Sequence, residues 1–560
     1  IMKPLQLLSL SLFSSAVLIG CSPESNKMLE PTVDAASETA EIEAMLHEHI
    51  AALASDEFEG RAPATPGEEK TINYLQSEFE ALGIGPGNGD SYFQGVSVTE
   101  ITTASDTVLT FSGSNYDAEL EYATEMIVGS QQQIPTASIV DSELVFVGYG
   151  VVAPERNWND YAGIDVVGKT VIILVNDPGY STQDPDIFNG NAMTYYGRWT
   201  YKYEEAARQG AAGALIVHET GPAGYGWEVV SGSWSGPQIG LQADNLNSDK
   251  NDIEGWLTLD SAEALFAGAG LNYQQLKATA AQPGFTAVPL GDVTASVAIQ
   301  NSVRTSLSQN VIAMIPGTER PTETIIYTAH WDHLGVTAEI PGDNIYNGAA
   351  DNATGTAALL AMAKMHVDAG PAPRSIVFLA VTAEESGLLG SRWYTEHPVF
   401  PLATTVANIN IDVLNTYGPM HDIVVVGNGS SELEAYLEEA ATAQGRHLVE
   451  EPNPERGYYY RSDHFNFAKA GVPALYAESG EDSVEFGKKW GAEQAQDYNE
   501  NRYHAPSDEY DPNWNLEGAA QDILLYFDVA SKLSRESSFP NWLEGNEFKG
   551  IRDATSASRP

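Results

Sequence analysis

The sequence has little cysteine and little positive charge. Its 560 residues include one cysteine, and 28 lysines and arginines stand against 77 aspartates and glutamates, a formal net charge of -49. A single thiol excludes intrachain disulfides, and a strongly negative surface repels nucleic-acid phosphates. Solubility explains the acidic surplus, with a specific cationic partner as the alternative. Hydrophobic residues make up 43% and charged residues 19%, which excludes a disordered chain and a multi-span membrane protein.

The N-terminal segment has the pattern of an export signal. Lys3 precedes an apolar stretch from Leu5 to Ile19, which is too short for a membrane-spanning helix. Leu18-Ile19-Gly20-Cys21 resembles a bacterial lipobox, in which the cysteine is lipidated and becomes the N-terminus. We expect a signal peptide over 1–20, lipidation at Cys21, a flexible tether over 21–40, and anchoring to the cell envelope (outer membrane or periplasmic face) or release outside the cell. An ordinary signal peptide is the alternative.

The pattern of apolar residues changes along the remainder of the chain. Apolar spacing predicts one helix from Glu41 and another from Pro66 to Leu82, and residues 92–145 alternate as short strands. The next region, to about residue 285, has its own strands and a helix. After about residue 290, apolar strands alternate with helices. That pattern is typical of an α/β fold with a mostly parallel central sheet covered by helices on both faces.

Acidic and imidazole side chains follow the strand ends in this last part. Three strand ends and one helix start supply them, namely His330 with Asp332, Glu384 with Glu385, Asp412, and Asp351. A lone aspartate before a helix is usually an N-cap, and paired glutamates usually face solvent. Together, these groups converge on the carboxyl edge of a sheet, where ligands bind and where uncompensated carboxylates are unfavourable. Imidazole and carboxylate donors without thiolate suit zinc.

Five motifs occur in order along the chain, H-W-D, G-A-A-D-N-A-T-G, A-E-E-S-G-L-L-G-S, N-I-D and R-Y-H-A-P-S-D. In order and spacing they resemble the two-zinc exopeptidase family, which includes bacterial leucyl aminopeptidase, glutamate carboxypeptidase and the catalytically silent transferrin receptor. The resemblance covers about residues 41–125 and 290–535. It implies a peptidase domain in two parts, 41–135 and the catalytic 286–540, around a β-rich protease-associated domain over 136–285, with a C-terminal tail over 541–560.

The resemblance also implies a set of metal ligands. Asp351 would bridge two zinc ions, with His330 and Asp412 completing the ligands of one ion and Glu385 and His504 those of the other. Each ion would keep an open position for water. Mn²⁺ or Co²⁺ could replace zinc on the same oxygen and nitrogen donors.

Other matched positions would act beside the metals. The resemblance implies that Glu384 is the general base toward the metal-bridging water, that Asp332 orients His330, and that Tyr460 helps to stabilise the oxyanion. It also implies a cis peptide bond between Asp351 and Asn352. The other histidines, including His333, lie outside every motif and are expected in the core or on the surface.

The sequence alone leaves three functions open. The first is a membrane-tethered aminopeptidase acting on peptides, which the overall acidity favours because negative groups hold an α-ammonium. The second is a carboxypeptidase or dipeptidase on the same two-metal chemistry. Arg456 and Arg461 could bind a substrate carboxylate, with rim salt bridges as the alternative. The third is a non-catalytic binding protein, which the retained ligands and Glu384 disfavour. The sequence gives no oligomeric state.

Overall fold

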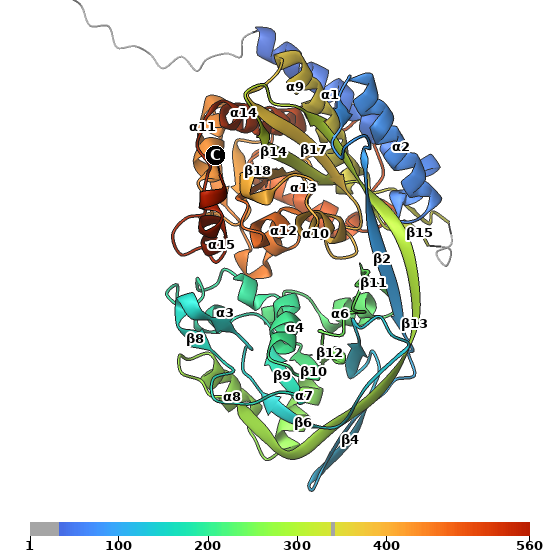
Figure 1. Cartoon of the computed structure of the whole chain (residues 1–560), viewed down its shortest axis with the longest axis vertical. Helices are drawn as coiled ribbons and strands as arrows, with labels where there is room; N and C mark the ends of the chain where they lie inside the picture. Colours follow the sequence, from blue (N-terminus) through green and yellow to red (C-terminus); the bar gives the residue numbers. More distant parts are fainter. Residues whose placement is uncertain (1–32, 338–341, 560) are drawn as a thin grey trace, which may run out of the picture.

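Two parts of the chain pack around separate hydrophobic cores, one above the other in Figure 1. The computed structural model describes residues 33–337 and 342–559. The expected signal peptide and Cys21 lie outside these residues. Among the described residues, no helix has both the length and the apolar character needed to cross a membrane.

The first part contains the mostly parallel sheet expected from the sequence. β14 pairs in parallel with β17 and with β18, and β18 pairs in parallel with β21. β13 and β19 pair antiparallel at either side, and β20 lies beyond β19. The strands are β13 (Val288–Ile315), β14 (Arg320–His330), β17 (Arg374–Val381), β18 (Thr405–Asn410), β19 (Asp422–Val425), β20 (His447–Glu450) and β21 (Ala474–Ser479). The predicted fold class is confirmed.

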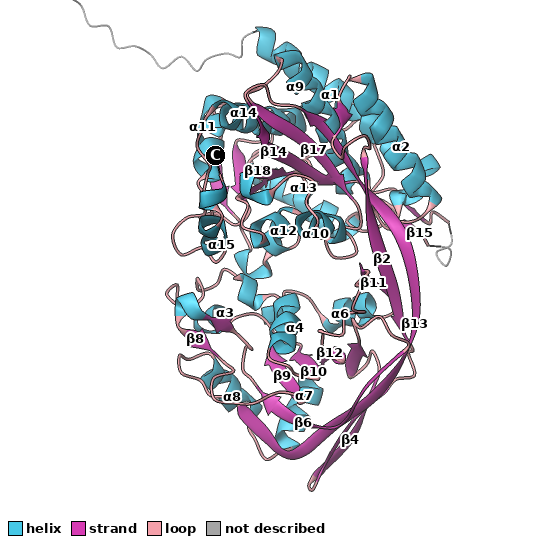
Figure 2. Cartoon of the chain, viewed as in Figure 1, coloured by secondary structure: helices cyan, strands magenta, loops and turns pink. Residues whose placement is uncertain are grey.

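Helices cover both faces of this sheet because its strands are apolar on both faces. Ile325 and Tyr327 of β14 pack into one core, whereas Ile326 between them packs into another. Figure 2 shows the helices around the strands. They are α1 (Val33–Leu53), α2 (Pro66–Ala81), α9 (Thr354–Ala369), α11 (Leu433–Ala443) and α14 (Glu517–Arg535) at the first core, α10 (Leu389–Glu396) and α12 (His464–Lys469) at the second, with α13 (Lys488–Asn501) beside the sheet.

Two terminal segments are more ordered than the sequence suggested. α1 begins at Val33, so the last part of the expected tether, 33–40, is helical. Residues 37–40 carry mostly exposed side chains, and such a turn gives no apolar periodicity. The expected C-terminal tail also packs on the sheet. Trp542 and Arg552 are buried, and the Arg552 guanidinium donates to the carbonyls of Thr405 and Val406 at 2.9 and 3.2 Å.

The second part is larger than the expected insertion. Its core runs from Leu109 to Ile299, so it takes in strands on both sides of the boundaries at 135 and 286. A parallel trio of β9, β10 and β12 lies at its centre. Its elements are β3 (Val108–Gly113), β4 (Tyr116–Glu121), β5 (Met126–Gly129), β6 (Thr136–Phe146), β9 (Thr170–Leu174), β10 (Gly213–Val217), β12 (Ile253–Leu257), α3 (Pro178–Thr182), α4 (Trp199–Arg208), α6 (Trp227–Trp234), α7 (Leu259–Gly268) and α8 (Tyr273–Ala280).

One long strand belongs to both parts. β13 pairs with β6 in the second part over Val288–Gln300 and with β17 in the first over Val311–Ile315. Between these stretches it pairs with β2 (Phe93–Thr103), which in turn pairs with β11 (Pro237–Leu241). Figure 1 shows β2 and β13 side by side along one edge of the molecule, where they connect its two halves.

Candidate metal centre

Parallel strands deliver the predicted residues to one edge of the sheet. His330 is the last residue of β14, Glu384 and Glu385 follow β17, and Asp412 follows β18. Carboxyl ends of parallel strands meet at the same edge, which is why residues far apart in sequence gather there. Asp351 comes from the irregular turn before α9, and the Asp351–Asn352 peptide bond is cis, as the resemblance implies.

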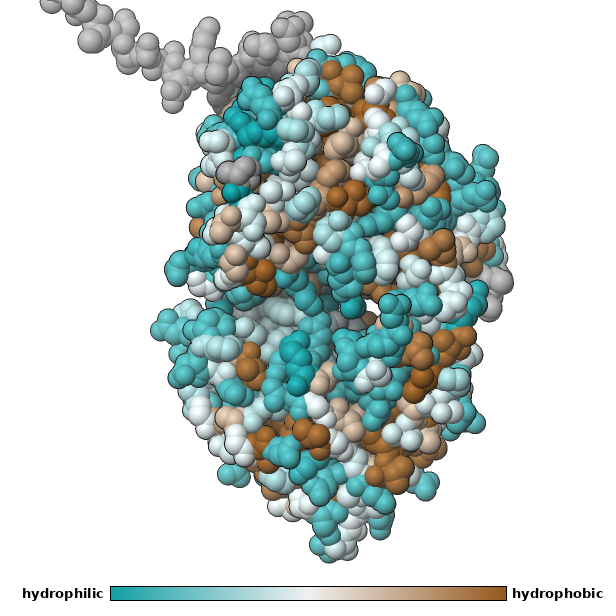
Figure 3. All heavy atoms as spheres, viewed as in Figure 1, coloured by the Kyte–Doolittle hydropathy of each residue, from teal (hydrophilic) through white to brown (hydrophobic). Residues whose placement is uncertain are grey.

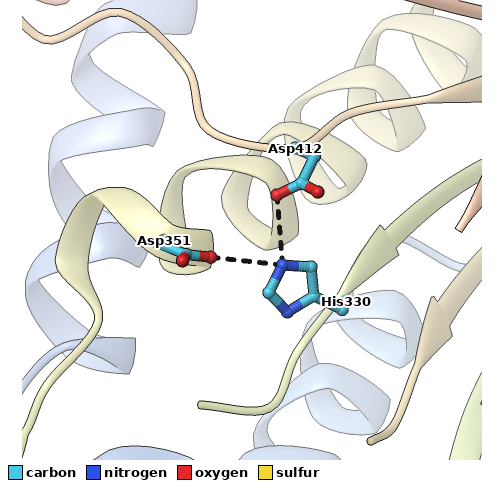
Figure 4. Close-up of side chains that lie close together, drawn as sticks. All are labelled: His330, Asp351 and Asp412. Atoms are coloured by element: carbon cyan, nitrogen blue, oxygen red, sulfur yellow. Dashed lines mark hydrogen bonds and ion pairs between the residues drawn. The ribbon is translucent and has the colours of Figure 1, made fainter. Parts of the chain in front are cut away.

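The first group of ligand atoms surrounds His330. Its Nε2 atom lies 3.3 Å from Asp351 Oδ1 and 3.1 Å from Asp412 Oδ1. Figure 4 shows the imidazole directed at both carboxylates. His330 is 1% exposed, so the group is shielded from bulk solvent.

The second group surrounds His504, which follows α13. Its Nε2 atom lies 3.3 Å from Asp351 Oδ2 and 3.0 Å from Glu385 Oε2. Asp351 therefore presents one carboxylate oxygen to each group. The geometry brings together the five residues expected as ligands and places Asp351 between the two sets.

His333 belongs to the same cluster, although the sequence pattern gave it no role. Its Nδ1 atom lies 2.6 Å from Glu385 Oε1, and it forms a candidate metal-binding group with Asp351 and Glu385. His333 is buried, as expected of a core histidine, but it also contacts a predicted ligand, which the sequence analysis did not expect. Its position in H-W-D-H, on the loop that leaves β14 directly after His330, was the available signal.

Glu384 and Asp332 lie against this cluster. Ligand atoms of Glu384, Glu385 and His330 lie within 4.8 Å of one another. The Glu384 amide donates to Asp332 Oδ1 at 3.1 Å. His330 Nδ1 lies 3.1 Å from the Asp332 carbonyl and 3.8 Å from Asp332 Oδ1, so the hydrogen bond that orients its ring goes to the backbone of Asp332 rather than to its carboxylate.

Tyr460 is placed differently from the other predicted residues. Its hydroxyl lies 3.3 Å from Glu547 Oε1, and its ring packs edge-on against Phe465 in the second core of the sheet. Within the described residues, no hydrogen bond, ion pair or ring contact joins it to the ligand cluster, although it lines the same cavity as Glu384, Glu385 and His504. The oxyanion role of Tyr460 stays a prediction.

The donor atoms fit divalent cations. Burial alone would lower the pKa of His504, but its contacts with Asp351 and Glu385 raise that pKa to about 10. Burial likewise raises the pKa of Asp332 to about 8 and that of Glu384 well above its usual range. Carboxylates crowded in a buried site thus attract positive charge. Their oxygens, together with imidazole nitrogens, match the donors of zinc and suit Mn²⁺ or Co²⁺ as well.

Two residues that the sequence analysis missed hold the ligand loops in place. Arg61 is buried, and its guanidinium donates to the carbonyls of Trp331, Asn347 and Gly348 at 2.9, 2.6 and 2.8 Å. Asp508 accepts hydrogen bonds from the amides of Ala350 and Asp351, each at 3.0 Å. Arg61 thus joins the loop after β14 to the turn before α9, and Asp508 fixes the backbone of the shared carboxylate.

The cluster opens onto a cavity between the two halves of the molecule. The cavity has a volume of about 1110 Å³, and Glu384, Glu385 and His504 line it from one side. Arg198 and Trp199 at the start of α4 line it from the other. Figure 3 shows the surface hollowed between the two halves.

Comparison with known proteins finds similarity to peptidases over part of the chain. Residues 310–528 match the profile of peptidase family M28. Aminopeptidase YwaD of Bacillus subtilis (strain 168) is 28% identical over 203 residues, which cover 36% of this chain and 39% of that protein. Aminopeptidase NAALADL1 of Mus musculus is 32% identical over 176 residues, covering 30% of this chain and 21% of that protein. These matches span less than half the length of either relative.

A solved structure of an aminopeptidase from Aneurinibacillus sp. strain AM-1 superposes with a TM-score of 0.48 at 20% identity, covering 89% of this chain and 95% of that one. The matched segment 310–528 contains all the predicted ligands, together with His333 and Asp508. The segment that matches the profile of peptidase family M28, residues 310–528, therefore supplies the whole of the candidate metal centre.

Proposed function

We propose that this protein is a zinc-dependent aminopeptidase that removes N-terminal residues from peptides. The observation that carries the proposal is the Asp351 carboxylate, which faces His330 with one oxygen and His504 with the other beside Glu384. Such a shared carboxylate is expected where two divalent ions act on one substrate. The names of the similar aminopeptidases support the same activity.

The residues of the site divide the work of hydrolysis. Zinc ions held by Asp351, His330, Asp412, Glu385 and His504 would supply Lewis acidity for the scissile carbonyl and for the attacking water. The Glu384 carboxylate takes the proton from that water and passes it to the leaving amine. Burial raises the pKa of Glu384 above its usual range, in the direction that makes a carboxylate a better proton acceptor. The surplus of carboxylates favours an α-ammonium group nearby.

A substrate panel tests this function. The purified protein is assayed on aminoacyl fluorogenic substrates with free and with blocked amino groups, before and after removal of metal with a chelator. We expect hydrolysis of the free-amino substrates only, lost on chelation and restored by zinc. Undiminished hydrolysis by protein whose metal content has been measured as zero would contradict the proposal.

A carboxypeptidase or dipeptidase is the second candidate, and two arginines favour it. Arg198 and Arg461 line the cavity from opposite halves, and within the described residues neither forms an ion pair with a carboxylate. The Arg198 Nε atom is buried and has no hydrogen-bond partner. Burial, and then the charge of Arg461, lower the pKa of Arg198 to about 10, so it remains a cation at neutral pH. Such a pair can bind a substrate carboxylate.

Replacing Arg198 by alanine separates the two candidates. If the arginine binds the C-terminal carboxylate of short peptides, KM for free dipeptides should rise about tenfold to a hundredfold, because a charge-assisted hydrogen bond is lost. KM for the same peptides as C-terminal amides should not change. Arg208→Ala is the matched control, since Arg208 lines the same cavity but pairs with Glu205 at 2.8 Å. Equal changes in KM for the acids and the amides would contradict the second candidate, and aminopeptidase activity would be the only one of the two still supported.

The second half of the molecule is proposed to be the protease-associated domain expected from the sequence. It supplies no group of the metal-ligand cluster among the described residues, but it walls the cavity with Arg198, Trp199 and Trp234. A wall of this kind favours short peptides over folded proteins. Rates on a dipeptide, a long peptide and a folded protein carrying the same N-terminal residue test this preference, and equal rates would contradict it.

Export and lipid attachment at Cys21 are likewise proposed from the sequence alone. The lipobox resemblance places the lipid on the single thiol of the chain. A Cys21→Ala protein expressed in its host should be lost from the detergent-extracted membrane fraction, because its only predicted anchor is gone. Unchanged partitioning into that fraction would contradict the anchor.

A further inference from the structure

His333 contacts only one side of the ligand cluster. Glu385 directs Oε2 toward His504 at 3.0 Å and Oε1 toward His333 Nδ1 at 2.6 Å. The two oxygens of this one carboxylate therefore face different partners. The shorter distance is typical of a charge-assisted hydrogen bond, whereas the 3.0 Å contact on the other oxygen resembles the contacts among the other predicted ligands.

The surroundings fix the imidazole of His333 in this place. The residue is 1% exposed, and its amide donates to the Arg61 carbonyl at 3.4 Å. Gly348 lies directly against the ring, since a Cβ atom at that position would come within 2.5 Å of His333 Cγ. Gly348 also has a φ of 54°, a conformation that favours glycine. A ring held this firmly can in turn hold the side chain that it contacts.

The neighbouring glutamate has no such partner. Within the described residues no hydrogen bond reaches the side chain of Glu384, although its amide is bonded to Asp332. Glu384 and Glu385 are adjacent, identical in type and both close to His330. A donor on only one of them can decide which carboxylate binds metal and which remains free for proton transfer.

We propose that His333 is a positioning residue for the metal ion bound by Asp351, Glu385 and His504. Its Nδ1–H group donates to Glu385 Oε1 and leaves Oε2 for the ion. Groups that hydrogen-bond to a metal-binding carboxylate pre-orient it, and their removal weakens metal binding by about 10- to 100-fold. The inference rests on the metal centre of the proposed function.

A series of three substitutions tests the donor. Asparagine can place an amide N–H near the position of Nδ1, glutamine places it near Nε2, and alanine places none there. We expect His333→Ala and His333→Gln to bind the zinc ion at Asp351, Glu385 and His504 about 10- to 100-fold less tightly than the unchanged protein does. His333→Asn should stay within about threefold because the donor is kept. Affinity is measured by competition with a chromogenic chelator, and stoichiometry by elemental analysis.

The absorption spectrum of the Co²⁺-loaded protein is a second test. The d–d absorption of Co²⁺ responds to the number, kind and geometry of its ligands. His333→Asn should therefore keep the band of the unchanged protein, and His333→Ala should alter it because Glu385 is no longer held in place. A change in packing alone would not move this band. His366→Ala is the control, because His366 is also a buried histidine with one side-chain partner, the Tyr327 hydroxyl at 3.0 Å, and lies in no candidate metal group of the described residues.

The possible outcomes are distinct. If all three His333 variants bound metal as tightly as the unchanged protein, the inference would be overturned and the proposed function would stand. Loss of the ion in His333→Asn as complete as in His333→Ala would also overturn it, since the imidazole would then be a ligand itself. Failure of the unchanged protein to bind any divalent ion would overturn the proposed function together with the inference.

Discussion

Glu384→Gln is expected to lower kcat by about 10²–10⁴ while both metal ions remain bound. Glutamine keeps the shape of the side chain but cannot accept the proton of the attacking water. The ligands are unaffected, because Glu385 is held separately by His333 and His504. Steady-state kinetics on a free-amino substrate, with metal content measured on the same sample, checks both halves of the expectation.

The control for this variant comes from the same cavity. Glu396 also lines it but lies in an ion pair with Arg392 at 2.8 Å. Glu396→Gln should therefore leave kcat within about twofold, as is usual for a substitution at an exposed ion pair. Near-normal turnover of Glu384→Gln with both ions present would show that another group takes the proton.

Asp351→Asn is expected to weaken the binding of both ions by about 10²-fold or more, since ligand loss removes part of a large metal-binding free energy. The reason is the division of its carboxylate, with Oδ1 toward His330 and Oδ2 toward His504. Asp412→Asn should weaken one ion only, because Asp412 contacts His330 and not His504. Chelator competition that resolves two binding steps measures the difference.

Asp368→Asn is the control for Asp351→Asn. Asp368 lies on the same helix, α9, but it is exposed and pairs with Lys364 at the far end. Metal binding should not change in this variant. If Asp351→Asn lost only one ion, its carboxylate would serve a single site and the two-ion arrangement would be wrong.

Much of the catalytic half could be predicted from the sequence because its signals are local. The strands ending at His330, Val381 and Asn410 are apolar on both faces, and the residues after them are acidic or imidazole. A parallel sheet brings such ends together without any knowledge of side-chain packing. The ligand cluster follows from the order of the strands.

The supporting residues could not be predicted in this way because their roles arise only in the folded protein. Arg61 is separated by 270 residues from Trp331, whose carbonyl it binds, and nothing in its neighbourhood marks a partner. His333 acquires its contact from the turn that carries Gly348 and from the segment after β17. Tyr460 is a position that the resemblance matches, yet its ring packs beside Phe465 and its hydroxyl lies near Glu547.

The shared strand β13 limits how the two halves can move. Between residues 301 and 311 it is bonded continuously to β2, and this ribbon is the stiff element that joins the halves along one edge. A single flexible linker would allow free rotation, but widening the cavity here requires the ribbon to bend or its inter-strand hydrogen bonds to break. The halves also touch away from this ribbon, where the Met193 amide donates to the Pro454 carbonyl at 3.0 Å and Lys469 Nζ lies 2.9 Å from Glu204 Oε1. Widening the cavity therefore costs contacts at both places, and we expect its width at rest to set the size of substrate that can enter.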